Sequence, residues 1–60
     1  MNLERHGNQV SILLENTDEV ENFNNILAEY LDTVQVYEEE KDLANNILLF
    51  LETEYFINKN

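Results

Sequence analysis

The sequence predicts an α+β fold, in which an N-terminal β-hairpin over about residues 3–14 precedes two helices, over about 17–32 and about 36–56. Three observations predict it: a turn signal flanked by alternating apolar residues, an apolar repeat of three and four behind a helix cap, and a segment without glycine or proline. We expect one small domain of 60 residues, in which the helices form an antiparallel pair against one face of the hairpin.

The hairpin is predicted from Gly7-Asn8, a two-residue turn in which glycine supplies the positive φ. Beyond the turn, Val10, Ile12 and Leu14 alternate with other residues and therefore share one face of a strand. The predicted cross-strand pairs are His6 with Gln9, Arg5 with Val10, Glu4 with Ser11 and Leu3 with Ile12. Leu3 then joins the apolar face.

The first helix is predicted to begin after Asn16, whose side chain can cap it. Glu19, three residues later, is in the position that reaches back to the cap residue. Asp18, Glu19 and Glu21 also suit the positive end of the helix dipole. The apolar positions recur at intervals of three and four: Val20, Phe23, Ile26, Leu27, Tyr30, Leu31 and Val34.

The second helix is predicted from good helix formers between Glu38 and Glu54. The junction at 33–37 is rich in β-branched residues, so strand, loop and helix all stay open there. At 100° per residue, a wide apolar stripe covers about half of the helix. Leu49 and Phe56 fall outside this stripe, which indicates either ordinary exposed residues or a second contact surface.

A chain of 60 residues is close to the lower limit at which a domain buries enough apolar surface to fold alone. Cysteine is absent and His6 is the single histidine, so neither a disulfide nor a Cys/His zinc site can supply the missing stability. We therefore predict a homodimer in which the second helix packs against its symmetry mate in a four-helix core. The residues predicted to make this contact are Leu43, Ile47, Leu48, Leu51 and Tyr55.

Thirteen acidic residues against three basic ones give a formal net charge of −10. Such a chain is repelled by nucleic-acid phosphates and by anionic membranes, so we expect neither as a direct partner. A protein with a basic surface would be attracted. The N-terminus lacks a signal-peptide pattern and no apolar run approaches the length of a membrane span, which predicts a cytoplasmic protein.

Residues that could carry chemistry are few. Ser11, the only serine, has no neighbouring base, and His6 sits at the predicted turn. The acidic run at Glu38, Glu39, Glu40 and Asp42 could attract a cation, but successive helix residues diverge by about 100° and cannot converge on one ion. We expect no enzymatic activity, no metal and no cofactor.

Three functional hypotheses follow. The first is a non-enzymatic interaction protein, a homodimer that binds and modulates one protein partner as an adaptor, neutraliser or inhibitor. The second is an acidic nucleic-acid mimic, of the kind that phages and mobile elements encode, which blocks a DNA- or RNA-binding protein. The third is a structural oligomerisation module. The residues predicted to contact a partner are Leu49, Phe56, Glu38, Glu39 and Asp42.

Overall fold

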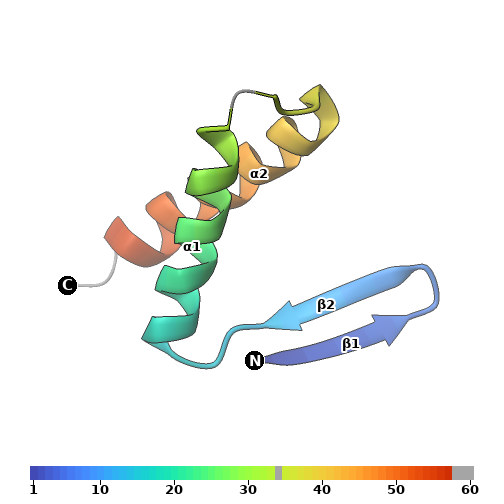
Figure 1. Cartoon of the computed structure of the whole chain (residues 1–60). Coiled ribbons are helices and arrows are strands. Elements are labelled where there is room, and N and C mark those ends of the chain that lie inside the picture. The colour runs from blue at the N-terminus through green and yellow to red at the C-terminus, as the bar shows by residue number, and fades with distance from the viewer. Residues whose placement is uncertain (34, 58–60) are drawn as a thin grey trace.

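A computed structural model of the chain describes residues 1–33 and 35–57. It contains an antiparallel two-stranded hairpin followed by two helical segments, which confirms the predicted α+β fold (Figure 1). Val34, which we included in the apolar repeat of the first helix, lies outside the described residues.

The hairpin consists of β1 (Asn2–His6) and β2 (Gln9–Leu13), joined by Gly7-Asn8. All four predicted cross-strand pairs are confirmed, and the register extends to Asn2 opposite Leu13. Gly7 has φ +65°, and no other described residue has a positive φ. Glycine fits the first turn position because it adopts this left-handed conformation without the steric penalty of a Cβ.

Helix α1 (Thr17–Leu31) begins as predicted, because the Asn16 side chain accepts a hydrogen bond of 2.9 Å from the backbone N–H of Glu19. The predicted return bond is displaced by one residue. The Glu19 carboxylate accepts from the backbone N–H of Glu15, at 2.9 Å, instead of from Asn16. Its other oxygen lies 2.6 Å from the N-terminal ammonium of Met1, so Glu19 joins the start of the hairpin to the start of α1.

Helix α2 (Glu38–Phe50) begins two residues later than predicted, and the described residues of the 33–37 junction form no strand. It continues directly into η1 (Leu51–Phe56), a π-helical segment where the sequence predicts an α-helix. The Thr53 hydroxyl donates to the carbonyl of Leu49 at 2.9 Å, where the α-helical N–H bond of the same residue would form. Such back-bonding perturbs a helix, which gives a local reason for the wider turn.

The two helical segments pack as an antiparallel pair, held at both ends by tyrosine hydroxyls. Near the connecting segment, Tyr30 donates to Glu40 at 2.5 Å. At the opposite end, Tyr55 and Thr17 are hydrogen-bonded at 3.2 Å. Ala44 is buried between these ends, where its small side chain permits close approach of α1 and α2.

The hairpin does not pack on the helices as we expected. Every residue of β1 and β2 is exposed, and the two strands project away from the helical pair (Figure 1). The alternating pattern defines an apolar face, but within one chain that face is uncovered.

Candidate interaction surface

The accessible surface of this chain is larger than that of typical folded monomers of the same mass. Its accessible area is 5200 Å². Folded monomers of 7.1 kDa expose about 4,100 Å² by the usual size scaling, so the excess is about 1,100 Å². Among the described residues, the buried apolar side chains are Val20, Ala44 and Leu51. A single copy therefore leaves most of its large apolar groups in contact with water.

The apolar face of the hairpin is the first part of this exposed surface. Cross-strand partners share a face, so Leu3 and Ile12 lie side by side, and Val10 lies beside Arg5. Leu3, Val10 and Ile12 are all exposed. Arg5 is the one charged side chain on this face of the two strands, which carries no carboxylate.

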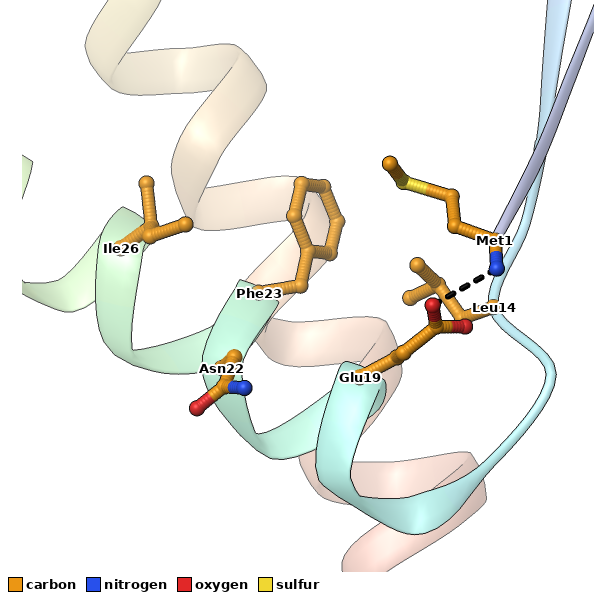
Figure 2. A pocket seen from close by; sticks show the side chains of 6 residues that line it. All are labelled: Met1, Leu14, Glu19, Asn22, Phe23 and Ile26. Atoms are coloured by element: carbon orange, nitrogen blue, oxygen red, sulfur yellow. Dashed lines mark hydrogen bonds and ion pairs between the residues drawn. The ribbon is translucent and has the colours of Figure 1, made fainter.

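A hollow of about 200 Å³ adjoins this face where the hairpin meets α1. Continuing the register by one pair places Met1 opposite Leu14, and both line the hollow together with Phe23 and Ile26 of α1. Figure 2 shows the side chains of Met1 and Phe23 directed towards each other across it, with the Glu19 contact at its margin. The apolar surface thus continues from the hairpin onto the helix.

A second hollow, of about 290 Å³, lies between α1 and α2 and shares Ile26 with the first. We call it the interhelical groove. Apolar side chains dominate its lining, and Glu40 and the hydroxyl-bearing Tyr30 supply its polar groups. The lining residues are Ile26, Leu27, Tyr30, Glu40, Leu43, Ala44 and Ile47. Ile26, one of the apolar positions that recur along the first helix, is exposed here.

Two hydrogen bonds to carboxylates beside these hollows shift pKa values. The hydrogen bond to the N-terminal ammonium lowers the pKa of Glu19, helped by the Glu15 N–H, and the same contact raises the pKa of the ammonium. At the groove, the hydrogen bond to the Glu40 carboxylate raises the pKa of Tyr30, because that bond requires the phenolic proton. The first hydrogen bond joins the start of the hairpin to α1, and the second joins α1 to α2, so each connects a charged group to the packing of two elements.

The acidic residues predicted to contact a partner lie at the start of α2. Glu38, Glu39 and Asp42 are exposed, and the first two line an open hollow of about 410 Å³ with Tyr37 and Glu40. Glu40 belongs to both this hollow and the interhelical groove. Negative charge therefore borders the groove at one end.

The residues predicted for the dimer contact are largely used inside the chain. Leu51 is buried, and Ile47, Leu48 and Tyr55 are half-buried. Leu43 is exposed and lines the interhelical groove. Their role in a contact between two copies stays a prediction.

Leu49 and Phe56, which the helical wheel placed on one side, have different environments. Leu49 is exposed, whereas Phe56 is half-buried and makes an edge-to-face contact with Tyr55, with ring centroids 5.2 Å apart. The wheel assumed 100° per residue, but the π-helical turn of η1 rotates less per residue. The two side chains therefore diverge.

The part of the chain that the structure describes contains no group of three or more side chains placed to hold a metal ion. His6 lies 3.2 Å from Glu4 on the exposed hairpin. Among the same residues, no helix has the length and apolar character needed to cross a bilayer. No family model matches the chain, and comparisons with curated proteins and solved structures found no match.

Proposed function

We propose that this chain is a small acidic interaction protein that forms a homodimer and binds a specific protein partner, without enzymatic activity of its own. The observation that supports this proposal is the excess exposed area of about 1,100 Å², since a standard interface removes about 800 Å² from each partner. Exposed apolar side chains lie on the hairpin, around the Met1–Phe23 hollow and along the interhelical groove, and the two hollows share Ile26. We propose the cytoplasm as its compartment, with which the absence of cysteine is compatible.

The interhelical groove is the proposed site for the partner. Its apolar lining suits an apolar segment of another protein, and Glu40, with Glu38 and Glu39 nearby, favours lysine or arginine beside that segment. The net charge of −10 would speed the encounter with such a partner at low salt. We therefore propose a partner that presents large apolar side chains flanked by basic residues.

Affinity capture from the source cell, followed by titration of the purified partner, tests this proposal. Leu43→Glu places a charge in the groove and should weaken binding by about 100-fold, in the range of an interface hot spot. Leu49→Glu is the matched variant, because it makes the same change on α2 at a residue of similar exposure, 59% against 63%, outside the groove lining. It also tests the alternative partner surface at Leu49 that the sequence predicts. This variant should retain binding within about twofold.

Two outcomes would overturn this assignment. Loss of binding in Leu49→Glu but not in Leu43→Glu would move the partner site to the opposite side of α2. Binding that both variants retain, and that high salt abolishes, would favour the nucleic-acid mimic, since such contacts are made by carboxylates.

A further inference from the structure

The outer edge of β2 is an unpaired strand edge of unusual composition for this chain. Its five residues, Gln9–Leu13, carry no charge and no proline, and include the β-branched Val10 and Ile12. Native proteins block open edges with charged or proline residues, because an uncharged edge pairs readily with another strand. The β2 edge has neither charged residues nor proline.

We infer that β2 pairs antiparallel with β2 of a second copy about a two-fold axis at Ser11, giving a four-stranded sheet in the order β1, β2, partner β2, partner β1. The inference deepens the proposed function and rests on its homodimer. A second copy is the occupant because an isologous edge contact closes after two chains, and because the excess area of about 1,100 Å² exceeds the usual share of one partner.

Hydrogen-bond directions support the register. In a hairpin with a two-residue loop, the residues flanking the turn, His6 and Gln9, form a hydrogen-bonded pair, and the pairs then alternate. The N–H and C=O groups of Val10 and Ile12 therefore point to the outer edge of β2. With Ser11 on the axis, Val10 lies opposite the partner's Ile12, and the two residues exchange both of their hydrogen bonds.

The side chains agree with this register. Val10 beside the partner's Ile12 is a favourable β-branched pair on the apolar face. On the other face, the row reads Glu4, Ser11, the partner's Ser11 and the partner's Glu4. The two carboxylates are then three strand spacings apart, about 14 Å, which exceeds the screening length of about 8 Å in physiological salt.

The edge of β1 does not offer the same contact. Its own two-fold pairing about the central residue would place Glu4 directly opposite the partner's Glu4, and like charges in that position are destabilising. Met1, immediately before β1, is held by Glu19 of α1. The charge pattern therefore favours β2 over β1 as the edge that pairs.

Hydrogen exchange on the unmodified chain tests the inference, with mass measured by light scattering in the same samples. Above the dimer dissociation constant, the amides of Val10 and Ile12 should exchange at least about tenfold more slowly than below it. The amides of Leu3 and Arg5, which point to the outer edge of β1, should exchange equally at both concentrations. A dimeric mass with all four amides unchanged would overturn the edge contact while leaving the homodimer intact. A monomer at every concentration would overturn both.

A matched pair of proline variants gives a second readout. Ile12→Pro and Leu3→Pro alter cross-strand partners of similar exposure, 52% and 60%, and each removes an N–H that the hairpin itself does not use. Ile12→Pro should weaken dimerisation at least about tenfold, because each dimer loses two donors, whereas Leu3→Pro should change it by less than about threefold. Equal weakening by both variants would overturn the inference. Retention of the α-helical circular dichroism shows that the helices stay folded in each variant.

Discussion

Helices α1 and α2 with η1 bury Val20, Ala44 and Leu51 against one another, whereas every residue of β1 and β2 is exposed. The helical pair is also held at both ends by tyrosine hydroxyls. The hairpin has a well-defined register but no packed face. Since an isolated hairpin is marginally stable at best in water, this difference indicates that the helical pair is the more stable region. The hairpin would gain most from the second copy that we propose.

Among the substitutions that test this difference between helices and hairpin, we expect the largest loss of stability at Leu51. Leu51→Ala removes a buried side chain from the helical pair and should reduce the free energy of unfolding by about 2 to 4 kcal/mol. A domain of this size has only about 3 to 9 kcal/mol in total. Leu49→Ala, at an exposed position two residues earlier, should cost less than about 0.5 kcal/mol. Denaturant titration measures both, and equal losses would contradict the assignment of Leu51 to the core.

A smaller effect, confined to the hairpin, is expected from Gly7→Ala. The added Cβ meets no atom within 4 Å, so the cost comes from the φ of +65° alone. That backbone conformation costs an L-residue about 1 to 2 kcal/mol, enough to open a marginal hairpin. Cross-strand contacts seen by NMR should be lost while the helical circular dichroism is unchanged. Simultaneous loss of the helices would break the comparison, because it would show that the two regions fold as one unit.

The smallest effect concerns the contact between Glu19 and the N-terminal ammonium, which links the two regions. Because the pKa of Glu19 is lowered, its ionised carboxylate stabilises the contact at pH values above the ordinary pKa of 4.5. This stabilisation is lost as the pH falls through the lowered pKa. Because the pKa of the ammonium is raised, the protonated group stabilises the contact at pH values below the ordinary pKa of 8.0. This stabilisation is lost as the pH rises through the raised pKa. The link should therefore be strongest between pH 4.5 and 8.0.

An NMR titration of the Met1, Leu14 and Glu19 signals measures this window. Glu19→Gln keeps the shape of the side chain but removes its charge, so the window should disappear. High salt should make the pH titration of the unmodified chain more similar to that of Glu19→Gln, because salt screens a contact that is exposed to solvent. A titration of Glu19→Gln identical to that of the unmodified chain would contradict the role of this contact.

Local features were predictable from the sequence because they depend on residues close together in the chain. The turn at Gly7, all four proposed cross-strand pairs and the Asn16 cap follow from short-range geometry and are confirmed. The position of the hairpin relative to the helices was not predictable, since an alternating pattern marks an apolar face without showing what covers it.

The errors within the helices also have local causes. The carboxylate of Glu19 is shared between Glu15 and the N-terminal ammonium, and no capping pattern contains the second partner. The wheel for the second helix failed beyond Phe50, where the π-helical turn begins. The predicted contact residues for dimer and partner stay predictions. The groove adds Ile26, which the sequence pattern listed only as one of the apolar positions of the first helix.

The π-helical segment makes the end of this chain sensitive to length as well as to residue identity. A turn closed by i→i+5 bonds holds one more residue than an α-helical turn. Deleting one residue between Leu51 and Phe56 would allow ordinary α-helical bonding there, but it would also swing Tyr55 away from Thr17. Insertions and deletions in this short stretch should therefore be tolerated less well than most substitutions at the same sites.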